Sequence, residues 1–238
     1  MSGITFRACG REAQRMFIAG QSGSGKTVFA VSILRRAPRC VYIDPKRENK
    51  PGFPVVAATR FLTTAEGEPR AALLAALFAQ HGPRLTIQFG AAGHGQYRGT
   101  DAFHRAQAEA VAEAAFLHRN TLYAIDDAMG VLESSPPFWI GRILTEGRAL
   151  GVGFLGIPQR PHRVPLTMIS EAQHVVSFYL ALAADVARMC EVNPGFAAAH
   201  DLATADPEKG IGGEFLWHVQ GAKTVQRCAP LRGSEAAA

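Results

Sequence analysis

The sequence predicts an α/β fold with a central, mostly parallel sheet flanked by helices and a C-terminal β-hairpin. Apolar strand-like runs alternate with Ala- and Leu-rich segments along most of the 238 residues, which is typical of parallel strands joined by crossover helices. The last two apolar runs have no helical segment between them. They are separated by Gln220-Gly221-Ala222, a short polar and glycine-containing turn that indicates a hairpin.

A strand is expected wherever a short run of β-branched, aromatic or other apolar residues ends at a polar residue, a proline or a glycine. In chain order these runs are 16–19, 40–44, 55–58, 85–89, 122–125, 152–157, 174–180, 214–219 and 223–228. Most of them are separated by segments long enough to cross over the sheet, so the sheet should be largely parallel and covered on both faces.

The helices are expected between these runs, where Ala, Leu and other helix-forming residues predominate. They are predicted at 28–34, 65–80, 101–118, 138–150 and 184–192. Asp101 is a suitable N-cap for the third of them, because its carboxylate can accept a hydrogen bond from the first turn. Residues 90–99 are rich in glycine and are expected to form a loop.

Composition is ordinary for an α/β protein, with 47% hydrophobic and 19% charged residues. We expect residues 1–232 to form one domain and 233–238 to form a disordered tail.

No apolar run approaches the roughly 18 residues that span a bilayer, and no signal-peptide core is visible. The four cysteines lack C-x-x-C spacing, which favours buried thiols in a reducing compartment. A net charge of +5 permits a polyanionic partner without requiring one.

The strongest motif is a glycine-rich loop between the first strand and the first helix. It has the phosphate-binding pattern G-x-x-x-x-G-K-[ST] and consists of Gly20, Gln21, Ser22, Gly23, Ser24, Gly25, Lys26 and Thr27. The glycines let backbone N–H groups surround phosphate oxygens at a helix N-terminus. The lysine can reach the β- and γ-phosphates and the threonine hydroxyl can bind Mg²⁺. The loop predicts that ATP and Mg²⁺ bind here, with Lys26 also catalytic.

An acidic pair follows the strand 122–125. Asp126 stands where such ATPases carry the acid that holds the Mg²⁺ shell, so Thr27 and Asp126 are the predicted metal-site residues. Asp127 stands where many ATPases carry a glutamate that polarises the attacking water, and it is the predicted general base. Its side chain is one methylene shorter than glutamate. Two solvent-facing acids at a strand end are the alternative interpretation.

Two further polar residues lie near the strand 152–157. Gln159 follows this strand and is placed to sense the γ-phosphate. Arg148 precedes it and is predicted to be an arginine finger that reaches the nucleotide of a neighbouring subunit. Arg142 competes for that role. An arginine at this point in a chain can also simply bind solvent or a helix C-terminal carbonyl.

Taken together, these motifs resemble the FtsK–HerA superfamily of DNA-pumping ATPases. After the phosphate loop, the resemblance is carried in order by Ile43-Asp44-Pro45-Lys46, Ile125-Asp126-Asp127, Gly147-Arg148-x-x-Gly151 and Pro158-Gln159-Arg160-Pro161. In that superfamily a glutamine ends the strand after the acidic motif, often as Gln-Arg-Pro, and a later strand precedes an Asp-led helix, here at Asp185. The resemblance spans about Arg15 to Val219. The sequence departs from it at Asp127, where glutamate is commoner, and at Lys46-Arg47, where many relatives have His-Gly.

The length of the chain then indicates which members of the superfamily it resembles most. Chromosome and conjugation pumps carry additional membrane or DNA-binding modules, and we expect none in this sequence. A motor of this length resembles the genome-packaging ATPases of tailless, membrane-containing icosahedral viruses. The resemblance implies an ATPase that moves double-stranded DNA, working as a homo-oligomeric ring, expected to be a hexamer. It further implies a capsid vertex or portal protein as a partner, and a place in the host cytoplasm or the virion.

Other functions stay open at the level of sequence. A cellular or plasmid DNA translocase of the same superfamily would share every motif. A nucleotide-dependent phage assembly protein could use the phosphate loop as a switch without moving DNA. A small-molecule kinase would need a lid and an acceptor pocket, and the Gln159-Arg160-Pro161 segment argues against it.

Two basic stretches are candidates for contact with DNA. Arg98 lies in the glycine-rich loop 90–99, and Arg160 and Arg163 follow the predicted sensor. Phosphate contacts require only cationic side chains and backbone amides, so these arginines would bind duplex DNA without reading its sequence. A solvated basic loop is the alternative for each of them.

Overall fold

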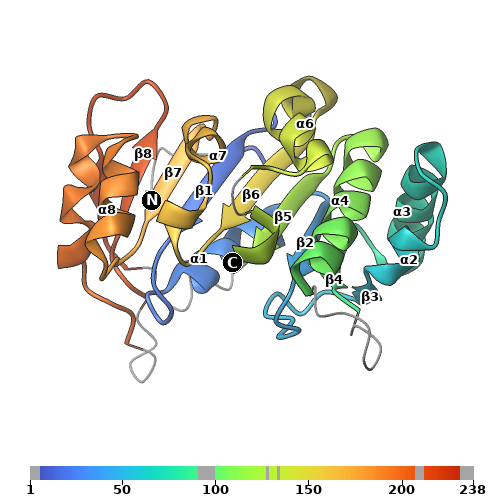
Figure 1. Cartoon of the computed structure of the whole chain (residues 1–238), viewed down its shortest axis with the longest axis horizontal. Helices are drawn as coiled ribbons and strands as arrows, with labels where there is room; N and C mark the ends of the chain where they lie inside the picture. Colours follow the sequence, from blue (N-terminus) through green and yellow to red (C-terminus); the bar gives the residue numbers. More distant parts are fainter. Residues whose placement is uncertain (1–5, 91–99, 127–128, 133–134, 207–211, 231–238) are drawn as a thin grey trace.

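The computed structural model describes residues 6–90, 100–126, 129–132, 135–206 and 212–230. Its strands are β1 (Arg15–Ala19), β2 (Cys40–Asp44), β3 (Val55–Ala57), β4 (Arg84–Gln88), β5 (Leu122–Asp126), β6 (Gly153–Ile157), β7 (His174–Ser177), β8 (Phe215–Val219) and β9 (Gln226–Cys228). They form one sheet in the order β3-β4-β2-β5-β6-β1-β7-β8-β9. All pairs from β3 to β7 are parallel, whereas β8 is antiparallel to both β7 and β9. The predicted α/β class, with its C-terminal hairpin, is confirmed (Figure 1).

Helices flank both faces of this sheet. The α-helices are α1 (Lys26–Arg36), α2 (Thr59–Leu62), α3 (Glu68–His81), α4 (Thr100–His118), α5 (Met129–Leu132), α6 (Phe138–Glu146), α7 (Leu166–Ser170) and α8 (Ala183–Cys190). Three 3₁₀ segments accompany them: η1 (Gly147–Leu150), η2 (Pro161–Arg163) and η3 (Pro194–Asp201). One face packs against α1, and the other packs against α3, α4, α6, α7 and α8.

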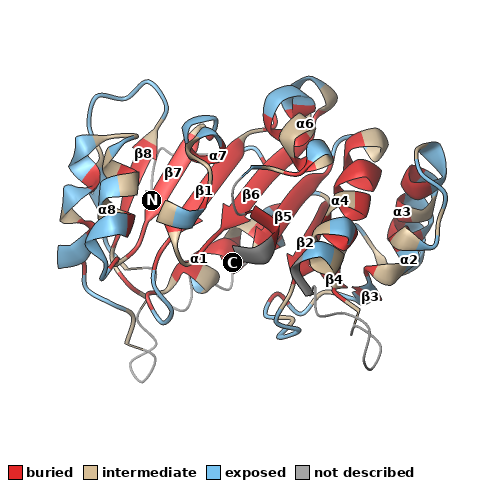
Figure 2. Ribbon diagram, in the orientation of Figure 1, coloured by how far each residue is buried: buried red, intermediate tan, exposed pale blue. Residues whose placement is uncertain are grey.

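The strands are buried on both faces, as Figure 2 shows for the centre of the sheet. In β1, Met16 and Ile18 pack in the cluster that includes α1, whereas Phe17 packs in the cluster of the opposite layer. This alternation follows from the two-residue period of a strand. A sheet covered by helices on both sides therefore needs nearly continuous apolar strands, which is how they read in the sequence.

Strand order brings the predicted motifs together. The strands β2, β5, β6 and β1 are parallel neighbours, so their carboxyl ends meet at one edge of the sheet. The phosphate loop follows β1, Asp126 ends β5 and Gln159 follows β6. Ligands of open α/β sheets bind at this edge.

The structure also differs from the predicted elements at several places. The helix predicted at 138–150 ends at Glu146 and continues as the 3₁₀ turn η1. Gly147 in this turn packs closely against the backbone just before β6: a Cβ there would lie 2.7 Å from the carbonyl oxygen of Val152. The strand predicted at 174–180 ends at Ser177, and the last strand is confined to Gln226–Cys228. The short helices α2, α5 and α7 were not predicted, because four or five residues give too little periodicity to recognise. The eight-residue 3₁₀ segment η3 was not predicted either.

All four cysteines are free thiols, as expected, but only Cys40 is fully buried. Burial raises the pKa of Cys40 to about 12. Among the described residues, no helix is both long and apolar enough to cross a membrane.

Candidate nucleotide-binding site

The phosphate loop turns from β1 into α1, and its backbone requires glycine at two points. Gly25 has a φ of 101°, in the left-handed region that strains other residues. A Cβ on Gly20 would lie 2.7 Å from both Cβ of Phe178 and Oγ of Ser24. Lys26 begins α1, where the N–H groups of the first turn and the helix dipole favour an anion. The backbone of the loop therefore suits a bound phosphate.

The segment before β8 packs against this loop from the side. A Cβ on Gly213 would lie 2.1 Å from the carbonyl oxygen of Ser24, and a Cβ on Gly25 would lie 2.7 Å from the amide nitrogen of Gly213. The two backbones are in direct contact, which only glycine permits. No motif in the sequence indicated this contact, apart from the pair Gly212-Gly213 between apolar runs.

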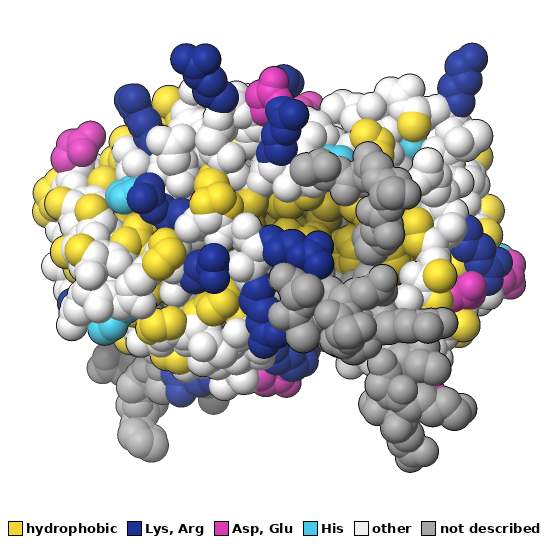
Figure 3. All heavy atoms as spheres, turned by 180° about the vertical axis from the view of Figure 1, so that it is seen from behind, with side chains coloured by type: hydrophobic (Ala, Val, Ile, Leu, Met, Phe, Trp, Pro, Cys, Tyr) yellow, Lys and Arg dark blue, Asp and Glu magenta, His cyan; other side chains and the backbone are white. Residues whose placement is uncertain are grey.

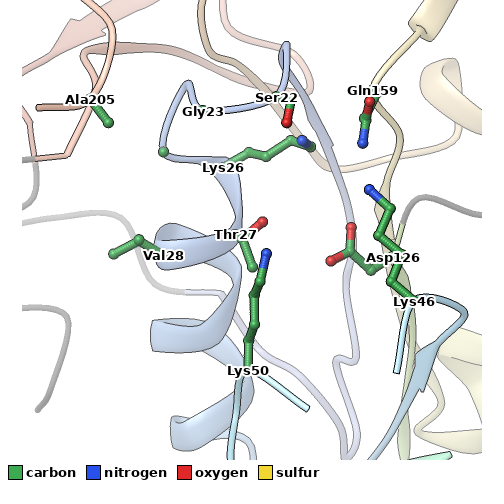
Figure 4. A pocket seen from close by; sticks show the side chains of 11 residues that line it. Ser22, Gly23, Lys26, Thr27, Val28, Lys46, Lys50, Asp126, Gln159 and Ala205 are labelled. Atoms are coloured by element: carbon green, nitrogen blue, oxygen red, sulfur yellow. The ribbon is translucent and has the colours of Figure 1, made fainter. Parts of the chain in front are cut away.

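A pocket of about 220 Å³ opens in front of the loop. It is lined by Ser22, Gly23, Gly25, Lys26, Thr27, Val28, Lys46, Lys50, Asp126, Gln159 and Ala205. Figure 4 shows the hydroxyl of Thr27 and the carboxylate of Asp126 on opposite sides of one space, with the amide of Gln159 beyond them. Hydroxyl and carboxylate oxygens are ligands that Mg²⁺ accepts, and lysines suit phosphate oxygens. The donor set therefore fits a magnesium–triphosphate complex.

Asp126 is held by a residue that sequence reasoning missed. The hydroxyl of Tyr42, a buried residue of β2, donates a hydrogen bond of 2.9 Å to Oδ2 of Asp126. Burial, and next the negative charge of Asp126, raise the pKa of Tyr42 well above its usual value, so the phenol stays protonated and remains a donor. The predicted base Asp127 lies outside the described residues.

Gln159, the predicted γ-phosphate sensor, lines the pocket, and the residues after it are anchored to α8. The buried carboxylate of Asp185 accepts a hydrogen bond of 2.8 Å from Nε of Arg160 and one of 3.2 Å from the backbone nitrogen of His162. Nδ1 of His162 lies 2.6 Å from Oδ1 of the same residue. Arg160, predicted to contact DNA, thus has an internal ion-pair partner that fixes the segment after Gln159.

Arg148 lies at the opposite end of the strands, where β6 begins. It sits in η1, which precedes β6, whereas the phosphate loop follows β1, the parallel neighbour of β6. The five residues of β6 separate these two ends by roughly 15 Å at about 3.3 Å per residue. Figure 1 shows α6, which η1 continues, at the upper ends of the strands and α1 nearer their lower ends. The exposed Arg148 side chain therefore lies too far from the phosphate loop of its own subunit to contact a phosphate bound there.

Arg142, the competing finger, is engaged within α6. Its guanidinium forms an ion pair with Glu146, at 2.5 Å, and lies 4.6 Å from the centre of the Phe116 ring and 5.4 Å from that of Trp139. These contacts hold the side chain against its own helix layer.

The structure gives a different result for each arginine that was predicted to contact DNA. Arg98 lies outside the described residues, and Arg163 is exposed in η2. Lys and Arg side chains gather across the middle of the face that α1 covers (Figure 3), and the last turn of α1 carries Arg35 and Arg36. This surface has the charge that a polyanion would require.

Comparison with solved structures identifies the fold. The chain superposes on the genome packaging NTPase B204 of Sulfolobus turreted icosahedral virus 2 in complex with AMPPCP, with a TM-score of 0.64 and 14% identity over 92% of this chain and 98% of that one. The complex of B204 with ATP-γS gives a TM-score of 0.62 at 13% identity, with the same coverage. The same values hold for B204 described as the DNA-packaging ATPase of Sulfolobus turreted icosahedral virus.

This chain shares the fold of a viral packaging NTPase. The predicted resemblance is thereby confirmed at the level of the fold. At the level of sequence, no family model and no curated protein matches the chain. The structures that it resembles include complexes with ATP analogues.

Proposed function

We propose that this protein is an ATP-driven translocase of double-stranded DNA that works as a genome-packaging motor. The observation that carries the proposal is the convergence of the phosphate loop, Asp126 and Gln159 on one pocket, within a fold shared with packaging NTPases. Fold alone does not assign a function, whereas a site with these side chains indicates phosphoryl-transfer chemistry.

ATP would bind with its β- and γ-phosphates against the backbone of residues 22–26 and the ammonium group of Lys26. Thr27 and Asp126 would hold Mg²⁺, which would neutralise negative charge on the phosphates when bound. Tyr42 keeps the carboxylate of Asp126 oriented toward that position.

Hydrolysis would then require a base and a sensor. Asp127, directly after β5, would take the proton from the attacking water as the water oxygen bonds to the γ-phosphorus and the bond to the β–γ bridging oxygen breaks. Gln159 would contact the γ-phosphate and report its loss to the segment that Asp185 anchors.

A ring would complete the site. Arg148 lies at the end of the strands opposite the phosphate loop, which is consistent with a finger that would serve a neighbouring subunit's nucleotide. We propose a homo-oligomeric ring, a hexamer, in which each Arg148 reaches across an interface. Duplex DNA would pass through the channel and contact Arg98 and Arg163, and a capsid vertex or portal protein would anchor the ring.

ATP turnover by the purified protein tests the proposal. The wild-type chain should hydrolyse ATP in a Mg²⁺-dependent manner, and Lys26→Ala should abolish turnover and weaken binding of ATP-γS. Lys223→Ala, which removes an exposed lysine from the turn before β9, is the matched control and should leave turnover unchanged. Equal turnover by wild type and Lys26→Ala would place the activity elsewhere and overturn the site.

A further inference from the structure

The pocket contains more positive charge than the phosphate loop supplies. Lys46 and Lys50 line it in addition to Lys26, and both come from the loop between β2 and β3. In Figure 4 the Lys46 side chain runs alongside Asp126 toward Gln159, whereas the Lys50 side chain ends beside Thr27. The three ammonium groups thus approach the same space from different sides.

The loop that carries these two lysines is anchored from within. Oδ2 of the buried Asp44 accepts a hydrogen bond of 2.7 Å from the backbone nitrogen of Asn49. Oδ1 of Asn49 accepts one of 2.6 Å from the hydroxyl of Thr86 in β4, and its Nδ2 donates one of 3.0 Å to the carbonyl oxygen of Phe53. These contacts fix the loop immediately before Lys50.

The same loop is fixed immediately after Lys46. The guanidinium of Arg47 donates hydrogen bonds of 3.1 and 2.6 Å to the carbonyl oxygen of Phe89. Arg47 and Asn49 have φ values of 58° and 43°, a left-handed conformation that costs free energy in residues other than glycine. Such conformations persist where the surrounding contacts impose them, and they cluster at ligand sites.

Lys50 can be released to a ligand at small cost. It forms an ion pair of 2.5 Å with Glu48, and both side chains are 46% exposed. Exposed pairs of this kind contribute little to stability. A phosphate group, with more charge and more acceptor oxygens than one carboxylate, would compete effectively for the ammonium group.

We propose that Lys46 and Lys50 bind the γ-phosphate in the same subunit and make the pocket selective for triphosphates over diphosphates. The inference rests on the proposed nucleotide site and deepens it. Lys26 can reach both the β- and the γ-phosphate, so its charge serves ADP as well as ATP. The two loop lysines enter from the side of Asp126 and Thr27, where the terminal phosphate and its metal would lie. Their charge therefore stabilises the bound nucleotide only while the γ-phosphate is present.

The test compares nucleotide affinities of Lys46→Met and Lys50→Met, which keep most of the aliphatic stem and remove the charge. Lys46→Arg and Lys50→Arg restore the charge, and Lys223→Met removes a lysine outside the pocket. Dissociation constants for ATP-γS and for ADP, each with Mg²⁺ and at one ionic strength, are measured by titration calorimetry. Circular dichroism verifies that every variant is folded.

Each Met variant should bind ATP-γS roughly tenfold more weakly, as expected for one lost charge-assisted contact, and ADP within about twofold of wild type. The Arg variants should recover most of the loss, and Lys223→Met should match wild type. If both Met variants keep the wild-type preference for ATP-γS, or lose ADP binding equally, the inference is wrong while the nucleotide site stands. A wild-type protein that binds neither nucleotide would overturn the proposed function and this inference together.

Discussion

The hydroxyl of Tyr42 lies 2.9 Å from Oδ2 of Asp126 and donates a hydrogen bond to it. The two residues belong to neighbouring parallel strands, and Tyr42 pairs in register with Ala124, two residues before the carboxylate. The bond therefore links the predicted metal-site acid to the rigid centre of the sheet rather than to a loop. A carboxylate oriented in this way is prepared for one metal position.

Tyr42→Phe should raise the Mg²⁺ concentration needed for half-maximal ATP turnover by roughly tenfold, because loss of an outer-sphere partner weakens metal binding by about that factor. Maximal turnover at saturating Mg²⁺ should change much less. The matched control is Tyr123→Phe, which removes a buried hydroxyl in β5 that donates to the carbonyl oxygen of Ala108. A Mg²⁺ requirement that shifts equally in both variants would indicate a general effect on stability instead.

Asp127→Asn should bind ATP and Mg²⁺ normally and hydrolyse ATP roughly 100-fold more slowly, because the amide cannot accept the proton of the attacking water. Single-turnover hydrolysis and ATP-γS binding, measured on the same preparation, separate the two effects. Unchanged hydrolysis would assign the base elsewhere. Glu48 would then be tested first, because it pairs with the pocket residue Lys50, whereas Glu146 pairs with Arg142 at the end of α6.

Asp185→Ala should lower the free energy of unfolding by about 2 to 3 kcal/mol, because it leaves Arg160 and His162 without the buried carboxylate that they share. Asp201→Ala is the control, since the Asp201 side chain is 64% exposed and its pairing with His200 is weak. Urea denaturation measures both. Equal stability of the two variants would show that the hydrogen bonds of Asp185 contribute nothing to the free energy of unfolding.

DNA binding should weaken steeply with salt, because it would depend on phosphate contacts. Replacing Arg98 and Arg163 by alanine should reduce the slope of log affinity against log salt by up to about 0.9 for each lost phosphate contact. Adding Arg160→Ala completes the set but also removes the Asp185 ion pair, so the double variant is the cleaner test. The exposed residues Arg60 and Arg119 provide a charge-matched control, and an equal effect there would leave the DNA path unassigned.

Arg148→Ala should keep ATP binding and lose hydrolysis, because no second cation would reach the γ-phosphate from a neighbouring subunit. Mixing it with Lys26→Ala protein should restore part of the activity, since a mixed interface can combine an intact loop with an intact finger. A mixture that stays inactive while subunits demonstrably exchange, or a monomer that hydrolyses ATP normally, would exclude this role. Arg142→Ala would be tested next, although its guanidinium already packs on Phe116 and Trp139.

Much of the fold could be predicted because it rests on local signals. The strand at 40–44 and the loop at 20–27 are defined by apolar runs and glycines that need no knowledge of distant residues. The functional site could not be predicted from local signals alone. Tyr42 reads as a core residue within its strand, and only the pairing of β2 with β5 brings its hydroxyl to Asp126.

The lysine loop was equally hard to predict from sequence. In the sequence, Lys46 stood out only as a departure from the His-Gly of the superfamily that the motifs resemble. The left-handed φ values at Arg47 and Asn49, which help to shape the loop, have no sequence signature. Arg160 was predicted to contact DNA because it is a basic residue directly after Gln159, and that prediction remains untested. Its buried partner Asp185 could not be recognised from sequence, because it lies 25 residues further along the chain.

The central claim is that ATP hydrolysis by this protein drives the movement of duplex DNA. The most direct measurement is the steady-state ATPase rate at saturating ATP and Mg²⁺, with and without long double-stranded DNA, and with single-stranded DNA as the control. The account predicts that duplex DNA stimulates turnover severalfold, that Lys26→Ala abolishes both rates, and that the stimulation declines as salt increases. A turnover that duplex DNA leaves unchanged at low salt would contradict it.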